Sequence, residues 1–144
     1  MSGIKDPKKS IIWLASYPKS GNTWLRLFFE NLLNNKDQPV QIDEEFSYVK
    51  FSDMSPELYL GLANKGLGLL SDTEVLSLRR QTHQRLSNMA EPIVLAKTHA
   101  PMGSVYGIPM FYPETTAKAV YILRNPLDIV DSFADHMGYS KKKL

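Results

Sequence analysis

The sequence predicts an α/β fold with a mainly parallel sheet between layers of helices. Three short apolar runs, at residues 11–15, 93–97 and 119–123, are predicted strands, and the first has the continuous apolar composition of a strand covered on both faces. Segments with helical patterns lie between the first two runs and after the third. Strands that alternate with helices favour parallel pairing through right-handed crossovers. In such a sheet ligands bind beyond the carboxyl ends of the strands, so function is expected at that edge.

The helices are predicted from apolar spacing and from residues typical of helix ends. The run at 22–35 is apolar around most of its circumference, which predicts a heavily buried helix. Pro56 opens a short helix, a capping-box spacing opens a second at 71–89, and Pro126 opens a last one. Residues 98–116 contain three prolines and two glycines and are predicted to form a long loop.

Length and charge indicate one modest domain with no general affinity for anions. The 144 residues are 43% hydrophobic, and we expect a single domain over 1–144 with flexible tails at 1–10 and 138–144. The formal charge is +2, but six lysines lie in those tails, and the rest has 11 basic and 14 acidic side chains. This balance favours neither nucleic acid nor a membrane as partner, so any anion site must be built locally.

The remaining composition points to a soluble, cytoplasmic protein. The chain has no cysteine, which excludes disulfides and thiolate metal sites and is compatible with a reducing compartment. The polar N-terminus does not read as a signal peptide, and no apolar run approaches the roughly 20 residues of a membrane span. Three scattered histidines without a carboxylate pattern predict no metal site, and His83 and His136 are expected to be solvated.

Charged side chains follow each of the three predicted strands. Lys19 follows the first strand, Lys97, Thr98 and His99 follow the second, and Arg124 follows the third. Because parallel strands end at the same edge of a sheet, these side chains are expected to converge.

The first of these joints has the features of an anion site. Gly21 permits a tight turn, and the backbone N–H groups of residues 20–23 open a helix with unpaired donors. Lys19 adds a cation, and the hydroxyls of Ser20 and Thr23 add donors. The pattern is related to the P-loop, but its lysine precedes its only glycine. The alternative is an ordinary strand-turn-helix corner with a surface lysine.

Two aromatic side chains near these joints allow two interpretations each. His99 lies just past a strand, where an imidazole with a pKa of about 6.5 can take a proton from a hydroxyl; the alternative is a histidine bonded for structure. Trp24 can stack on a nucleobase beside the anion site. A tryptophan in an apolar helix more commonly packs in the core, and from the residues alone we expect the core.

The third joint carries a candidate phosphate ligand. Arg124 offers a planar fork that suits a phosphate, and Ser132 lies eight positions on in the following helix, within reach of the same group. The alternative is an ion pair from Arg124 to Asp128 that closes the turn.

Together, these motifs resemble the sulfotransferase family that uses 3′-phosphoadenosine 5′-phosphosulfate (PAPS), and specifically its cytosolic type. Residues 17–24, YPKSGNTW, resemble the family's 5′-phosphosulfate loop, and Lys97-Thr98-His99 resembles the strand end that carries its catalytic base. Arg124-Asn125-Pro126 with Ser132 resembles its 3′-phosphate motif. Order and spacing match from residue 11 to about 137, and Asn22 stands where many members have threonine.

The resemblance implies a P-loop-like three-layer fold and transfer of a sulfuryl group from PAPS to a hydroxyl or amine of a small-molecule acceptor, without a metal. The implied catalytic residues are His99 as base, Lys19 at the leaving group and Lys97 near the sulfuryl oxygens. Those implied to bind the donor are Lys19, Ser20, Gly21, Asn22, Thr23, Trp24 on the adenine, Arg124 and Ser132.

The chain departs from the family at its C-terminal end. Family domains are longer, and nothing here corresponds to the glycine- and lysine-bearing loop that completes their nucleotide pocket. We therefore expect a fold truncated at the C-terminus, either a fragment or a natural short form, with an uncovered sheet edge through which chains can associate. Two alternatives stay open: a P-loop kinase-like enzyme, and a non-catalytic remnant that binds a nucleotide or a partner chain.

Overall fold

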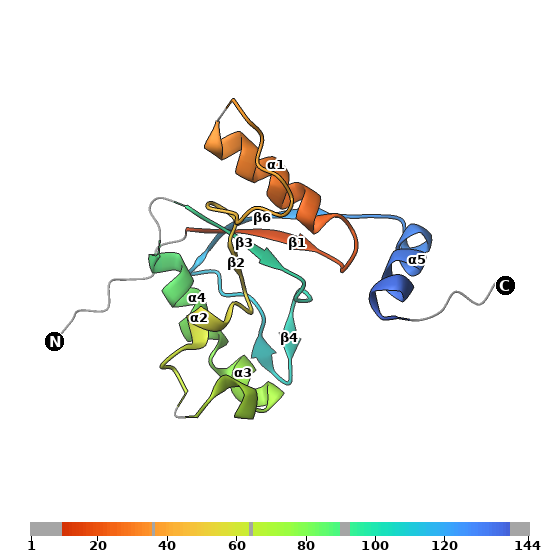
Figure 1. The fold of residues 1–144 in the computed structure, drawn as a ribbon. Helices are drawn as coiled ribbons and strands as arrows, with labels where there is room; N and C mark the ends of the chain where they lie inside the picture. Colours follow the sequence, from red (N-terminus) through yellow and green to blue (C-terminus); the bar gives the residue numbers. More distant parts are fainter. Residues whose placement is uncertain (1–9, 36, 64, 90–92, 139–144) are drawn as a thin grey trace.

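A four-stranded parallel sheet lies between two helical layers (Figure 1). The computed structural model describes residues 10–35, 37–63, 65–89 and 93–138. The sheet order is β2-β3-β1-β6. The strands are β1 Ile11–Ser16, β2 Phe51–Ser52, β3 Val94–Thr98 and β6 Thr116–Ile122, and a separate antiparallel hairpin pairs β4 Ser104–Val105 with β5 Ile108–Pro109. The helices are α1 Asn22–Asn34, α2 Pro56–Tyr59, α3 Asp72–Ser77, α4 Arg79–Asn88 and α5 Pro126–His136, with one 3₁₀ turn, η1, at Leu67–Leu69.

The predicted α/β class with a parallel sheet is confirmed. Strand β1 is central and pairs in parallel with β3 on one side and β6 on the other, so that Leu14 lies opposite both Lys97 and Val120. The carboxyl ends of the three strands therefore lie at the same edge of the sheet. In Figure 1, α5 lies beyond that edge, apart from the two helical layers.

Two apolar clusters, one on each face, hold the sheet. On one face Trp13 and Ala96 pack with Leu58 of α2 and Leu86 of α4. On the other face Leu14 and Leu95 pack under Leu25 of α1 and Val49. Figure 1 shows this as α1 above the sheet and α2 to α4 below it. The short apolar runs of β1 and β3 are thus covered on both faces, which is the reason for their unbroken hydrophobicity.

The structure corrects several predicted elements. Helix α1 is exposed along one side, with Trp24 69% and Leu32 59% exposed, so the prediction of burial around its circumference is wrong. The helix predicted at 71–89 is two helices that meet at Leu78. The predicted loop at 98–116 contains the β4-β5 hairpin, and strand β2 was not predicted because it is only two residues long.

The predicted capping box at the start of α3 is present. The Ser71 hydroxyl accepts from Glu74 N at 3.4 Å, and the Glu74 carboxylate accepts from Ser71 N at 2.8 Å. The hydrogen bond from the Ser71 backbone, together with those from Lys65 and the Ser71 hydroxyl, lowers the pKa of Glu74 to about 2. The start of this helix is therefore set by local sequence.

The predicted tails lie largely outside the described residues. Ser10, expected at the end of the first tail, is instead buried, and its hydroxyl donates to Ser87 O at 2.8 Å. No described helix is both long enough and apolar enough to cross a bilayer.

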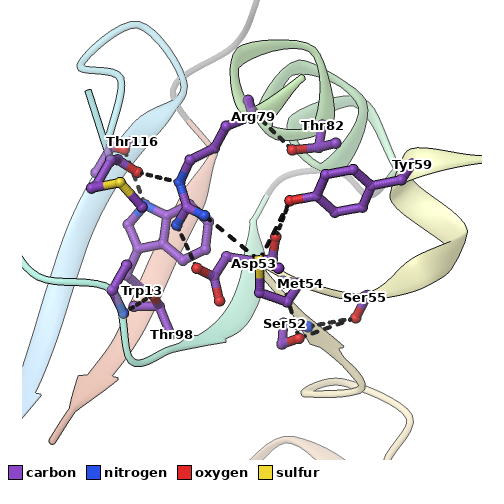
Figure 2. A network of polar contacts seen from close by, with 12 residues as sticks. Trp13, Ser52, Asp53, Met54, Ser55, Tyr59, Arg79, Thr82, Thr98 and Thr116 are labelled. Atoms are coloured by element: carbon purple, nitrogen blue, oxygen red, sulfur yellow. Dashed lines mark hydrogen bonds and ion pairs between the residues drawn. The ribbon is translucent and has the colours of Figure 1, made fainter. Parts of the chain in front are cut away.

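A buried ion pair links the strand layer to the helices below it, as Figure 2 shows. The guanidinium of Arg79 contacts the carboxylate of Asp53, and its Nε donates to Met110 O at 2.8 Å. The Tyr59 hydroxyl donates to Asp53 O at 3.0 Å, and Asp53 N donates to Lys97 O at 3.0 Å. The network therefore ties the end of β3, where a predicted site residue lies, to α2 and α4.

His83 is fully buried, so the prediction that it is solvated is wrong. Its ring lies 4.7 Å from the Trp13 ring, with Phe111 and Tyr112 on other sides. Among the described residues, neither ring nitrogen has a hydrogen-bond partner. Burial, with the nearby charge of Arg79, lowers the pKa of His83 to about 3.

Candidate functional site

The carboxyl ends of β1, β3 and β6 bring the three predicted joints together. His99, after β3, contacts Ser16 at the end of β1, with 2.7 Å between its Nδ1 and the Ser16 carbonyl oxygen. Arg124, after β6, donates from Nη1 to Lys19 O at 3.4 Å. Segments about 80 and 100 positions apart in the chain thus meet at one edge, as the parallel pairing requires.

The loop after β1 has the backbone of an anion-binding turn. Lys19 and Gly21 both have positive φ, at 66° and 105°, and Ser20 N donates to Tyr17 O at 3.2 Å. A left-handed conformation at a lysine is uncommon, and such strain is concentrated at functional sites. No side chain caps the N-terminus of the 13-residue helix α1, so its first N–H groups are left as donors.

A buried hydroxyl provides a second, independent indication of a ligand. Ser20 is 6% exposed, and its Oγ has no hydrogen-bond partner within the described part of the chain. A buried hydroxyl without a partner is costly unless something completes it. The uncapped helix end and this hydroxyl together can hold an oxyanion such as a phosphate.

The side chain of Asn22 turns away from the loop and into the protein. Its Nδ2 donates to Leu14 O at 2.8 Å and to Ser16 Oγ at 3.1 Å. Because both hydrogens of its NH₂ group are used, the backbone N–H is the hydrogen-bond donor that Asn22 has left for a ligand.

The geometry at His99 determines which ring nitrogen carries the proton. A carbonyl oxygen can only accept, so the 2.7 Å contact with Ser16 O places a hydrogen on Nδ1. Nε2 then keeps its lone pair in the neutral ring. Because the side chain is exposed, that lone pair can reach an acceptor molecule at the sheet edge.

Lys97 lies at the end of β3 and is half-buried. Burial, aided by the charge of Arg26, lowers its pKa, and the opposite charge of Asp53 counteracts this in part. The side chain is therefore more ready to share or release a proton than an ordinary surface lysine.

The residues of the third joint are less constrained. Arg124 is exposed, and no ion pair joins it to Asp128 among the residues that the structure describes, so the alternative of a turn-closing pair is not realised. Ser132 is half-buried on α5. The residues alone predicted Trp24 in the core, which is wrong: it is 69% exposed, and its ring stacks on Phe28 at 6.0 Å.

Two hollows border the loop. A cavity of about 550 Å³ is lined by Tyr17, Ser20, Arg124 and apolar side chains of α5, including Phe133. A second, of about 600 Å³, is lined by Thr23, Arg26, Lys50 and Phe51 together with acidic side chains. The loop therefore contributes to a mainly apolar hollow through Tyr17 and Ser20 and to a charged one through Thr23. Within the described residues, no group of His, Asp and Glu side chains could hold a metal ion.

Comparison with known proteins identifies the family. The family model described as "Sulfotransferase domain" matches residues 9–143. The chain belongs to the sulfotransferase family. The predicted resemblance is therefore confirmed, and the mainly parallel α/β sheet is consistent with the fold of sulfotransferases.

The similar sulfotransferases are mammalian proteins considerably longer than this chain. Sulfotransferase 1E1 of Bos taurus is 29% identical over 121 residues, which cover 83% of this chain and 33% of that protein. Sulfotransferase 1 family member D1 of Mus musculus and sulfotransferase 1B1 of Canis lupus familiaris are each 28% identical over 85% of this chain and 34% of their own lengths. The chain thus spans about a third of these relatives. No solved structure gives a comparable match.

Sequence reasoning missed Ser16 as a member of the site. Ser16 accepts from His99 through its carbonyl oxygen, and its hydroxyl lies between Asn22 and His99. No local pattern could have revealed this, because the contact joins positions 83 apart in the chain. Only the pairing of β1 with β3 brings them together.

Proposed function

We propose that this chain transfers a sulfuryl group from PAPS to a hydroxyl or amine of a small-molecule acceptor. The observation that carries the proposal is the meeting of an uncapped, lysine-bearing anion loop with a histidine whose Nε2 lone pair is free, at one edge of a parallel sheet. Family membership supports the reaction class. The cytosolic type that the motifs resemble supports a cytoplasmic site of action.

The loop after β1 would hold the 5′ end of the donor. The first N–H groups of α1 and the Ser20 hydroxyl would donate to the phosphate, and the Lys19 ammonium would lie over the bridging oxygen. Arg124 and Ser132 would bind the 3′-phosphate. The exposed face of Trp24 would stack on the adenine.

The chain's own side chains would supply the proton transfer and the charge stabilisation. PAPS provides a sulfuryl group bound to a phosphate leaving group. His99 Nε2 would take the proton of the acceptor hydroxyl as its oxygen bonds to sulfur, while the bond from sulfur to the phosphate oxygen breaks. Lys19 would neutralise the charge on that leaving oxygen, and Lys97 the charge on the sulfuryl oxygens. As in phosphoryl transfer, positioning and cations account for most of the acceleration.

A ligand titration separates this function from its alternatives. The chain is titrated with adenosine 3′,5′-bisphosphate and, separately, with ATP and magnesium. Preference for the bisphosphate supports the proposal. Preference for ATP with magnesium would favour a kinase-like enzyme, although the order of lysine and glycine in the loop counts against it. Binding of neither would leave a non-catalytic remnant.

Transfer of labelled sulfate from PAPS then tests the base. We expect His99→Ala to abolish turnover and to leave bisphosphate binding unchanged, because Nε2 acts on the acceptor rather than on the nucleotide. His136→Ala is the matched control, since that imidazole is exposed in the last turn of α5. Equal turnover by wild type and His99→Ala would remove His99 from the mechanism.

A further inference from the structure

We propose that Asn22 and Ser16 are positioning residues that hold His99 in the proton-accepting tautomer and join it to the anion loop. The catalytic consequence rests on the proposed function, whereas the tautomer itself does not. The chain of contacts runs from the first residue of α1 through the end of β1 to the residue after β3.

The orientation of the Asn22 amide is determined by its partner. Leu14 O can only accept, so the 2.8 Å contact must come from the NH₂ group of Asn22. The same nitrogen lies 3.1 Å from Ser16 Oγ, to which it donates its second hydrogen. A threonine hydroxyl has a single hydrogen and cannot make both bonds.

The Ser16 hydroxyl is thereby held against the imidazole. It accepts from Asn22 and lies 3.2 Å from His99 Nδ1, beside the 2.7 Å bond from Nδ1 to the Ser16 carbonyl oxygen. Both oxygens of one residue therefore face the Nδ1 hydrogen. The opposite tautomer would place the lone pair of Nδ1 against a carbonyl lone pair at 2.7 Å, which is repulsive.

Burial protects the Asn22 end of this arrangement. Ser16 is 4% exposed and Asn22 is 6% exposed, so water does not compete for the two bonds that the Asn22 amide donates, whereas the contacts with His99 are partly buried. Asn22 also supplies a backbone N–H to the start of α1, where the donor phosphate is proposed to bind. A single residue thus faces the anion with its main chain and supports the base with its side chain.

The first test is spectroscopic and needs no activity. Imidazole ¹⁵N shifts of His99 in the free protein at neutral pH are expected to show hydrogen on Nδ1. Asn22→Ala is expected to shift the population toward the Nε2–H form, and Asn22→Thr, which keeps one donor, to shift it less. Asn34→Thr, at the other end of the same helix, is the matched control. A wild-type ring with hydrogen on Nε2 overturns the proposal, whatever the enzyme does.

The second test is kinetic. If the chain transfers sulfate, Asn22→Thr and Ser16→Ala are expected to lower kcat on the order of tenfold and to shift its pH profile, since small misplacements of a catalytic group are costly. The Kd for adenosine 3′,5′-bisphosphate is expected to stay within about twofold, because the backbone cradle is intact. Loss of nucleotide binding with unchanged kcat and tautomer would overturn the positioning role.

The two proposals fail in different ways. If the wild type does not turn over PAPS, the proposed function fails, and the ¹⁵N shifts still decide the role of Asn22. If turnover is present but both Asn22 variants keep wild-type tautomer and kcat, positioning fails and the proposed function stands. The melting temperature of each variant shows whether it is folded, so that a loss of activity through unfolding is not taken for a loss of positioning. Asn22→Thr is the conservative variant and the one least liable to unfold.

Discussion

The two sides of the sheet differ in how completely their strands are covered. On β1 and β3 the side chains are mostly buried, and the polar groups near their ends bond to one another. On β6, in contrast, residues 117–121 are all exposed, and Leu123 and Leu127 beyond it are 76% and 79% exposed. The covered side, which is strands β1 and β3 with the residues that follow them, carries Lys19, Lys97 and His99. The open side, which is strand β6 with the residues that follow it, carries Arg124 and Ser132.

This difference shows which part of the site is organised in advance. The anion loop and the histidine are oriented by buried or partly buried hydrogen bonds that exist before any ligand binds. Arg124, in contrast, makes a single long hydrogen bond, to Lys19 O, with the residues that the structure describes. Under the proposed function, the 5′ end of the nucleotide would therefore meet a preformed site and the 3′ end a loose one, so that most ordering on binding is expected at α5.

The largest effect is expected at the buried ion pair of the covered side. Asp53→Ala leaves the Arg79 guanidinium buried without its partner, which should lower the free energy of unfolding by about 3–5 kcal/mol. Urea unfolding followed by circular dichroism measures it. Arg80→Ala, one position on in α4 with an exposed pair to Glu114, is the control and should leave the midpoint unchanged. Equal shifts of the unfolding midpoint in Asp53→Ala and Arg80→Ala would contradict the expected difference between a buried and an exposed ion pair.

A second effect on the covered side depends on pH. The folded protein keeps His83 neutral down to a pKa of about 3, whereas the unfolded chain takes up a proton below its ordinary value of 6.5. The contribution of this residue is therefore fully present above pH 6.5 and declines as the pH falls, by up to about 1.4 kcal/mol per pH unit until about pH 3.

The comparison of His83→Leu with the wild type isolates this residue. Arg79 and Tyr112 face the ring from α4 and the neighbouring loop and are unchanged in the variant. The free energy of unfolding, measured by urea between pH 7 and pH 4, should fall less steeply for the variant. Parallel curves would show that His83 is accessible to protons in the folded state.

A smaller loss is expected at the buried carboxylate of α1. Glu30 accepts from the backbone N–H groups of Ser47, Tyr48 and Val49 at 2.7, 2.9 and 3.2 Å, and so holds the segment that leads into β2. Glu30→Gln replaces one acceptor oxygen with a donor, which should lower the free energy of unfolding by about 1–3 kcal/mol. Chemical denaturation measures it, with the exposed Glu57→Gln as the control. No difference between the two would mean that the segment is held by its other contacts.

The smallest effect on stability is expected on the open side. Leu123→Glu alters a 76% exposed side chain, so the free energy of unfolding should change by no more than about 0.5 kcal/mol. One edge of β6 has no partner strand in the described part of the chain, so it can add a strand from a second copy, and a charge at this edge should weaken that association. Sedimentation equilibrium over a range of concentrations measures it. Wild type that stays monomeric at all concentrations would contradict self-association through this edge.

Local sequence patterns determined much of this protein. The apolar runs of β1, β3 and β6, the capping box at Ser71 and the turn at Gly21 follow from spacing and backbone preference within a few residues. Because parallel strands end together, the meeting of the loop, the histidine and the arginine could also be predicted.

Tertiary structure alone decided the properties that depend on contacts between distant segments. The proton on His99 Nδ1, the burial of His83 against Trp13 and the pairing of Asp53 with Arg79 depend on contacts between positions 26 to 83 apart. The exposure of Trp24 likewise depends on tertiary structure, because no described segment covers that part of α1. Hydrogen-bond direction and desolvation depend on which atoms surround a group in space. The spacing of apolar residues along the chain does not determine those neighbours.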